Sequence, residues 1–94
     1  MHHDKRYKTI NFVSCGHEED GAILYNPDTD NTSVINLSAL ELWAFLETPH
    51  TTGEIVDHLL QVYSNVSVEQ ATEDVKLFIE SLVPDFLQEI TDAD

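Results

Sequence analysis

The sequence predicts an α+β fold in which a three-stranded antiparallel sheet is followed by three helices. In the first half, short runs of β-favouring residues at 22–25 and 32–36 flank turn residues at 26–31. From Leu37 onward, apolar residues recur every three or four positions, which is the helical period. With 94 residues, the chain suffices for one small core but for no deep cavity.

The ends of the chain frame this domain. Residues 1–8 carry three of the four basic residues and are expected to form a flexible arm before a single domain at 9–90. Residues 9–14 are the first predicted strand. The segment 16–21 is bounded by glycines and rich in acids, which is typical of a solvated loop. Residues 91–94 are expected to form an acidic tail.

The turn at 26–31 contains Pro27, which presets its own φ, between Asx residues whose side chains bond nearby backbone groups. The flanking strands, 22–25 and 32–36, therefore form a hairpin. Because the strand at 9–14 precedes them, the three strands are expected to make an antiparallel meander.

The first predicted helix covers 37–46. Ser38 is the expected N-cap, since Glu41 follows at the capping-box spacing. Pro49 ends the helix, because the residue before a proline leaves the α region.

The second predicted helix begins at Thr51 or Thr52. Thr51 and Glu54 again have the capping-box spacing. His58 falls on the polar flank of this helix and is interpreted as a surface residue.

The third predicted helix runs from Ser67, a candidate cap, to Leu82, because Pro84 stops it. It is the longest amphipathic segment. Residues 86–90 that follow are interpreted either as a short final strand or as an apolar clasp.

The charge distribution excludes some partners. The chain has 4 basic and 18 acidic residues and a net charge of −14. Such a field repels phosphate backbones and anionic lipids, so nucleic acid and membrane surfaces are not expected partners. The acids either steer basic partners or only keep the domain soluble, and both interpretations stay open. One cysteine and no apolar run long enough to cross a bilayer favour a cytoplasmic protein.

No catalytic, metal or cofactor site is expected. Three glycines are too few for a phosphate loop. Cys15 lies near His17 but has no orienting third group in view. His17 with its neighbouring acids is better interpreted as a solvated loop, and His2-His3 lacks the convergent ligands of a metal site.

Three strands, three helices and a short end-strand describe a winged helix-turn-helix arrangement. Over roughly residues 20–90, the order of motifs resembles the PqqD-like family, whose members are peptide-binding modules called RiPP recognition elements. The resembling stretches are Gly21–Leu37, Leu42-Trp43, Thr51–Ile55, Val68–Val75 and Phe78–Leu82. Two stretches depart from the family pattern. Asp30-Asn31 stands where a glycine is usual, and Leu82–Leu87 replaces a glycine-containing ending.

The resemblance implies a non-catalytic module that binds the leader of a ribosomally made precursor peptide. The leader adds as an antiparallel strand beside the third strand, in a groove lined by the third helix. The module then presents it to a modifying enzyme, such as a radical SAM protein, or a protease or cyclase. A monomer or weak dimer is expected.

Carried onto this sequence, the resemblance predicts peptide-binding residues on two elements. The strand edge supplies Thr32, Ser33, Val34, Ile35 and Asn36, and the helix supplies Asp74, Leu77, Phe78 and Ser81. An exposed edge offers backbone groups to an added strand, and alternate side chains give selectivity. Phe78 lies on the apolar stripe and also fits a core position. Asp74 also fits a simple surface charge. Because neighbouring strand residues face opposite sides, Val34 and Ile35 cannot both avoid the core.

Two other functions compete with this hypothesis. A winged-helix DNA-binding regulator shares the architecture, but the third helix has only Lys76 against four acids. A general protein-interaction subunit of another enzyme is not separable from leader binding by sequence, whereas neighbouring genes would separate them.

Overall fold

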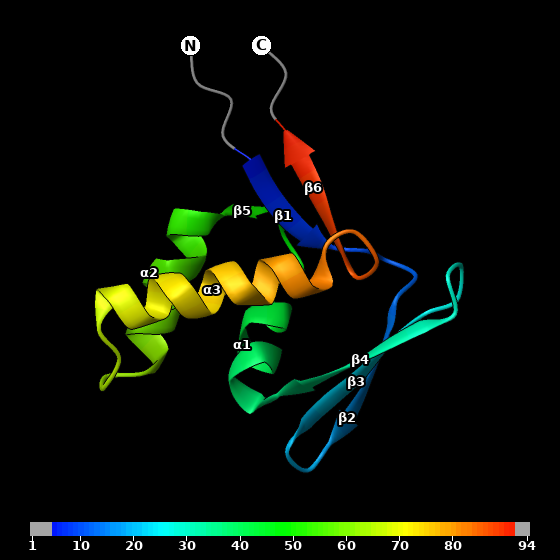
Figure 1. The fold of residues 1–94 in the computed structure, drawn as a ribbon, viewed down its shortest axis with the longest axis horizontal. Helices are drawn as coiled ribbons and strands as arrows, with labels where there is room; N and C mark the ends of the chain where they lie inside the picture. Colours follow the sequence, from blue (N-terminus) through cyan, green and yellow to red (C-terminus); the bar gives the residue numbers. More distant parts are fainter. Residues whose placement is uncertain (1–4, 92–94) are drawn as a thin grey trace.

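The computed structural model describes residues 5–91, which form six strands and three helices (Figure 1). In chain order the elements are β1 (Lys5–Thr9), β2 (Ser14–Glu18), β3 (Gly21–Asn26), β4 (Asn31–Asn36), α1 (Leu37–Phe45), β5 (His50–Thr51), α2 (Thr52–Val62), α3 (Val68–Leu82) and β6 (Leu87–Thr91). The predicted α+β class and three helices are therefore confirmed. The strands, however, make two three-stranded sheets, with orders β2-β3-β4 and β5-β1-β6.

The first sheet is the predicted meander with different starting boundaries. The strand expected at 9–14 is wrong, because Thr9 ends β1 and Ser14 begins β2. The loop expected at 16–21 is also wrong, since β2 continues through Glu18 and pairs with β3 across a two-residue turn. Backbone pairing with β3 outweighs the poor strand propensity of glycine and the acids here.

The arm expected at 1–8 is corrected by the second sheet. Residues 5–8 belong to β1, which pairs with β6 from Lys5↔Thr91 to Thr9↔Leu87. Tyr7 and Thr9 alternate into the core, so burial stabilises a strand that its charges alone did not suggest. Residue 91 likewise belongs to β6 rather than to a tail, and 86–90 is largely a strand. Residues 1–4, including His2-His3, and 92–94 lie outside the described part.

Helix capping was predicted correctly twice and wrongly once. The capping box of Thr51 and Glu54 opens α2, and Ser67 caps α3 by accepting from the Gln70 N–H at 3.1 Å. The expected cap Ser38 is wrong, because Asn36 Oδ1 accepts from the Ala39 N–H at 2.9 Å and α1 starts at Leu37. Asparagine is an equally good cap, so it moves the helix start to the end of β4.

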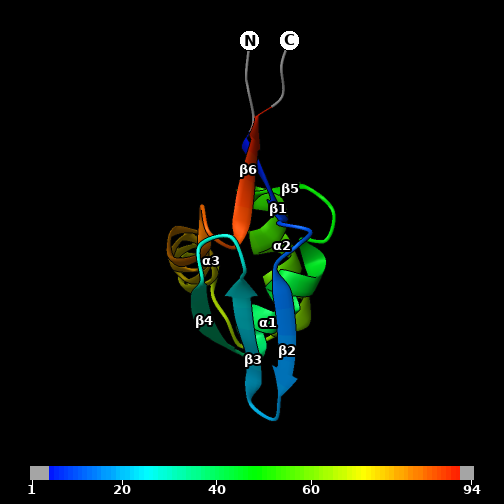
Figure 2. The same ribbon diagram turned by 90° about the vertical axis from the view of Figure 1, so that its right-hand side faces the viewer.

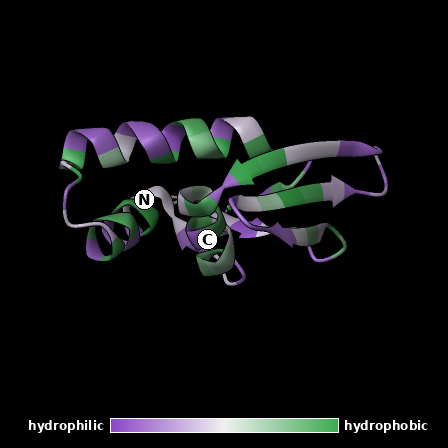
Figure 3. Ribbon diagram, turned by 90° about the horizontal axis from the view of Figure 1, so that it is seen from below, coloured by the Kyte–Doolittle hydropathy of each residue, from purple (hydrophilic) through white to green (hydrophobic). Residues whose placement is uncertain are grey.

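One core extends from the first sheet through the helices to the second sheet, which contributes Tyr7 and Leu87. Leu24 of β3, Leu46 after α1, Ile55 of α2 and Val75 of α3 are each fully buried. Figure 2 shows α1 behind this sheet and α3 beside β4. In Figure 3, hydrophobic segments recur among hydrophilic ones along α3. Among residues 5–91, the structure contains no helix with the length and apolarity needed to cross a membrane.

Candidate peptide-binding groove

The strand β4 is the edge of its sheet. It pairs with β3 on one side, and no strand of the described chain pairs with its other side. All six residues of β4 are uncharged. An edge strand of this kind leaves a row of backbone N–H and C=O groups without ladder partners.

The turn before β3 determines which of those groups point outward. Glu18 pairs with Gly21 across two turn residues, and the closing pair of such a turn exchanges backbone hydrogen bonds. Hydrogen-bonded and non-bonded pairs alternate along an antiparallel ladder. The backbone N–H and C=O groups of odd-numbered residues in β3 therefore point toward β2, and those of even-numbered residues point toward β4. The partners of the even-numbered residues include Ser33 and Ile35.

The outward backbone groups of β4 are therefore those of Thr32, Val34 and Asn36, and Asn36 also caps α1. A second observation agrees with this phase. A Cβ placed on Gly21 would lie 1.9 Å from the Ile35 carbonyl oxygen, so that oxygen points toward β3. Before the cap of α1, Thr32 and Val34 thus direct two donors and two acceptors away from the sheet.

The helix α3 forms the opposite wall of a groove beside this edge. Asp74, Leu77, Phe78 and Ser81 follow the i, i+3, i+4, i+7 spacing that places side chains on one face of a helix. The groove has a volume of about 630 Å³. Its lining residues are Ser33, Val34, Ile35, Asn36, Ser38, Ala39, Leu42, Leu59, Tyr63, Val66, Asp74, Leu77, Phe78 and Ser81.

The structure brings the sequence-predicted site residues together. All of them line the groove except Thr32, which lies on the edge next to it. The floor residues of α1 and α2 were missed, among them Ala39, Leu42 and Tyr63. In the sequence these residues occupy the apolar positions of amphipathic helices. The same pattern is expected for core residues and for residues at the bottom of a groove, so it does not distinguish them.

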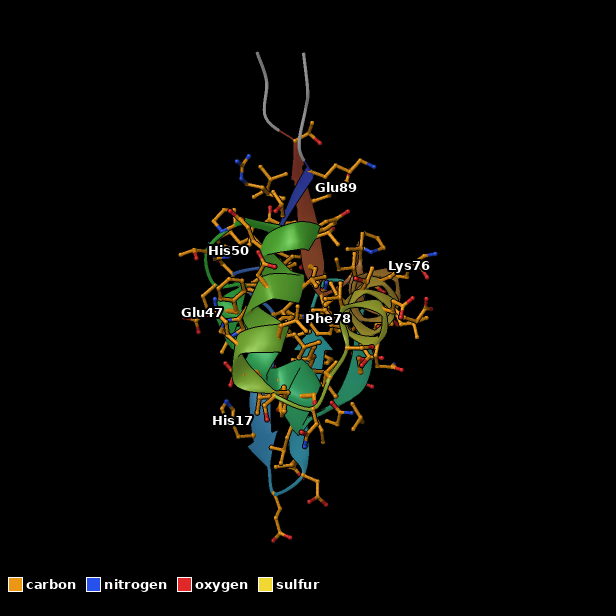
Figure 4. All side chains as sticks on the ribbon, turned by 90° about the vertical axis from the view of Figure 1, so that its left-hand side faces the viewer. His17, Glu47, His50, Lys76, Phe78 and Glu89 are labelled. Atoms are coloured by element: carbon orange, nitrogen blue, oxygen red, sulfur yellow. The ribbon has the colours of Figure 1, made fainter. Side chains whose placement is uncertain are left out.

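Exposure settles the positions left open on the walls. Ile35 is 7% exposed and faces the core, whereas Val34 is 80% exposed on the outer face of the sheet. On α3, Phe78 is 7% exposed and belongs to the core beneath the groove, while Leu77 is 54% exposed. Figure 4 shows Phe78 between α2 and α3, and Lys76 on the outer side of α3. Leu77 is thus the most exposed apolar side chain of α3 among those that line the groove.

Asp74 is the one charged side chain among the groove-lining residues. The Gln70 amide donates to Asp74 Oδ1 at 2.8 Å, and the residue remains exposed. At the other end of the wall, the Ser81 hydroxyl donates to the Phe78 carbonyl at 2.9 Å. Most residues that line the groove are apolar, and its negative charge lies on the N-terminal half of α3.

The two walls are tied together at the hairpin tip. The Asn31 amide donates to Asp85 Oδ2 at 2.6 Å, and the Asn26 amide donates to the Asp85 carbonyl. These bonds join the β3–β4 hairpin to the segment after α3. Asn31 and Asp85 lie in the two stretches that depart from the family pattern. The sequence shows that each stretch differs from the family pattern, but it does not show that the two stretches contact each other.

A second cluster lies away from the groove. The Phe45 ring stacks between His50, at a centroid distance of 3.8 Å, and His58, at 4.1 Å. His58 Nε2 lies 2.9 Å from Glu41 Oε2. His58 is therefore a packed residue rather than a simple surface residue, and Glu41 bonds to it instead of to a helix cap.

The thiol of Cys15 and the possible metal ligands of residues 5–91 are the remaining groups with reactive chemistry. Burial raises the pKa of the Cys15 thiol, which disfavours the nucleophilic thiolate. Among residues 5–91, no group of three or more His, Cys, Asp or Glu side chains is arranged to hold a metal ion.

Comparison with known proteins agrees with this geometry at the level of the family. Searches of curated proteins and of solved structures found no match. The sequence profile of a family described as coenzyme PQQ synthesis protein D (PqqD) matches residues 21–84. This range holds β3, β4 and all three helices, which include both walls and the floor of the groove. The chain belongs to the PqqD family.

Proposed function

We propose that this chain is a non-catalytic module that binds the leader of a ribosomally synthesised precursor peptide. The leader adds as an antiparallel strand to β4, and the module presents it in the cytoplasm to a modifying enzyme. A radical SAM protein, or a protease or cyclase, is the expected enzyme. Membership of a coenzyme-synthesis family supports an accessory role of this kind.

The observation that carries the proposal is the open edge of β4 beside α3. An added strand would satisfy the outward groups of Thr32 and Val34, while its side chains on the inner face would enter the groove. In β-augmentation, main-chain hydrogen bonds give affinity and side-chain pockets give specificity. Both parts are present along one edge.

The charges of the groove favour a peptide over DNA. If the fold is a winged helix-turn-helix, α3 occupies the place of a recognition helix. That helix carries Lys76 against Glu69, Glu73, Asp74 and Glu80. Phosphate contacts require Lys or Arg, so this surface would repel a nucleic acid backbone.

An amide NMR titration tests the proposal. The labelled chain is titrated with synthetic leader segments of short peptides encoded beside its gene. Shifts concentrated in 32–36 and 74–81 are expected. Absence of shifts with these peptides, combined with shifts on adding a neighbouring enzyme, would instead favour a general protein-interaction subunit.

A matched pair of variants locates the site. Leu77→Asp places a charge on the groove wall and is expected to lower leader affinity about tenfold. Val68→Asp changes a 63% exposed residue at the start of the same helix, outside the groove lining, and is expected to leave affinity unchanged. Equal effects of the two variants would contradict the assigned groove.

A further inference from the structure

The direction of the backbone groups of β4 determines which side chains of an added strand point to each face of the sheet. We call this assignment the reading frame of the added strand. In an antiparallel pair, residues that exchange hydrogen bonds lie directly opposite, and their side chains share one face of the sheet. A peptide residue opposite Val34 therefore points its side chain to the outer face. Its two neighbours lie opposite Ser33 and Ile35, on the inner face that contacts the groove.

The inner face offers apolar contacts to those two neighbours. Leu77 is half exposed on the wall, and Leu42 and Leu59 line the floor beneath it. An aliphatic or aromatic side chain at each inner position would bury apolar surface here. The outer position lies beside Val34, whose other cross-strand neighbour is Ile23, and this β-branched face suits a β-branched residue.

The orientation of α3 places Asp74 at the beginning of the peptide. The bond from Asn31 to Asp85 brings the start of β4 to the C-terminal end of α3. Asp74 therefore lies toward Asn36, at the other end of β4, and both residues line the groove. An antiparallel peptide runs from Asn36 toward Asn31, so it passes Asp74 first.

Lengths agree with this placement. From Asp74 to Ser81, α3 rises about 10 Å. The inner positions of a strand recur every second residue, about 7 Å apart. One inner position before the apolar pair therefore lies near Asp74, within reach of a long basic side chain. The net charge of −14 also favours a cation there.

Resting on the proposed function, we propose that the groove selects an extended segment in which one basic residue precedes two apolar residues at alternate positions. All three side chains lie on the face of the strand that looks toward α3. Asp74 selects the basic side chain, Leu77 and the floor select the apolar pair, and Thr32 and Val34 bond the backbone.

Two synthetic peptides of identical composition test the frame. In acetyl-Lys-Thr-Leu-Val-Leu-Thr-amide, the lysine shares a face with both leucines. In acetyl-Thr-Lys-Leu-Val-Leu-Thr-amide, it lies on the opposite face. The first peptide is expected to bind about two- to fivefold more tightly at low salt, because an exposed ion pair contributes modestly. High salt is expected to remove the difference.

Matched variants assign this difference to one carboxylate. Asp74→Asn is expected to make the two affinities equal. Glu80→Gln removes an exposed acid of α3 outside the groove lining and is expected to preserve the difference. If Asp74→Asn preserves the difference, the assignment of Asp74 is wrong.

Backbone methylation tests the hydrogen-bonding phase independently. An N-methyl group on the peptide valine removes the N–H that would bond Val34 and is expected to lower affinity at least about fivefold. The same group on the leucine before it removes an N–H that faces away from β4, with a smaller expected effect. Equal losses would overturn the assigned phase.

The outcomes separate this inference from the proposed function. If both peptides shift the amides of β4 and α3 with equal affinity, the reading frame is wrong and strand addition stands. If neither peptide shifts those amides up to its solubility limit, both the frame and strand addition at β4 are overturned.

Discussion

Each three-stranded sheet has two edge strands, and β4 of the first sheet and β6 of the second differ in character. β4 is uncharged and faces a groove whose other wall is α3. β6 carries Glu89, which pairs with Lys5 at 3.8 Å, and it extends away from the helices beside β1 (Figure 1). Charged side chains on an edge discourage the addition of another strand.

A free edge supplies backbone partners but does not by itself select side chains. At β6 a charged side chain disfavours the addition of another strand. At β4 no side chain is charged, and α3 offers side-chain contacts next to the edge. Only the second arrangement combines backbone partners with a surface that selects side chains.

The largest effect is expected from Gly21→Ala, which damages the pairing that presents β4. Gly21 has φ +154°, and an added Cβ would lie 1.9 Å from the Ile35 carbonyl oxygen. The free energy of unfolding, measured by urea denaturation, is expected to fall by about 3 kcal/mol.

Gly53→Ala is the control for that substitution. Its Cβ would meet nothing closer than Thr51 Oγ1 at 3.9 Å, and its place in α2 favours alanine. A gain of up to about 1 kcal/mol is expected. A Gly21→Ala protein as stable as the parent would contradict the close approach of β3 and β4.

Val34→Lys makes the β4 edge resemble the β6 edge. Leader affinity is expected to fall about tenfold, since the charge opposes strand addition and repels a basic peptide. Val34 is 80% exposed, so stability should change by no more than about 0.5 kcal/mol.

Titration calorimetry or NMR measures this affinity. Val68→Lys adds the same charge at an exposed position outside the groove lining and serves as the control. An unchanged affinity in Val34→Lys would remove β4 from the binding surface.

Asp85→Ala removes the hydrogen bond between Asn31 and the Asp85 carboxylate, which joins the two walls of the groove. The lost bond from Asn31 is expected to cost about 1 kcal/mol in urea denaturation. Amide exchange at the hairpin tip is expected to quicken, and leader affinity to fall. Asp28→Ala, in the turn between β3 and β4, is the control. The described hydrogen bond of Asp28 uses its backbone N–H, which the substitution keeps. Equal effects of both variants would show that the bond between Asn31 and Asp85 does not set the groove.

The smallest effect concerns the hairpin that carries the open edge. The Tyr25 hydroxyl donates to Asp30 Oδ1 at 2.7 Å. That bond, then burial and the charge of Asp30, raise the pKa of Tyr25. The neutral phenol is thus favoured in the folded chain. Its contribution to stability is present below the unfolded pKa of about 10 and is lost as pH rises through the higher folded pKa.

Asp30→Asn keeps a residue type that tolerates the φ of +62° at this position. It is expected to return the pKa of Tyr25 toward its ordinary value, as followed by NMR of the tyrosine ring. A pKa that stays raised in this variant would rule out Asp30 as the cause.

Much of the candidate site was predictable because its signals are local or periodic. The spacing of Thr51 and Glu54 identified the start of α2, and Pro84 identified the end of α3 near Leu82. The family resemblance picked out Asp74, Leu77, Phe78 and Ser81, and the structure places all four along the groove. Their assignment to peptide binding remains a proposal.

The cap of α1 failed for a local reason. Asn36 and Ser38 are both good caps, and the pattern of residues does not rank them. The connection of β4 to α1 without an intervening loop decides for Asn36, whose backbone still belongs to the strand.

The hairpin, the three helices and the alternation that makes either Val34 or Ile35 a core residue all follow from the sequence. These features depend on contacts within a few residues along the chain. Tertiary structure alone decided that residues 5–9 form a strand, because the partner of β1 is β6 at the other end of the chain. It also decided that Ile35 is buried and that Asn31 meets Asp85. Such contacts depend on which distant surfaces bury one another, and no local pattern encodes that pairing.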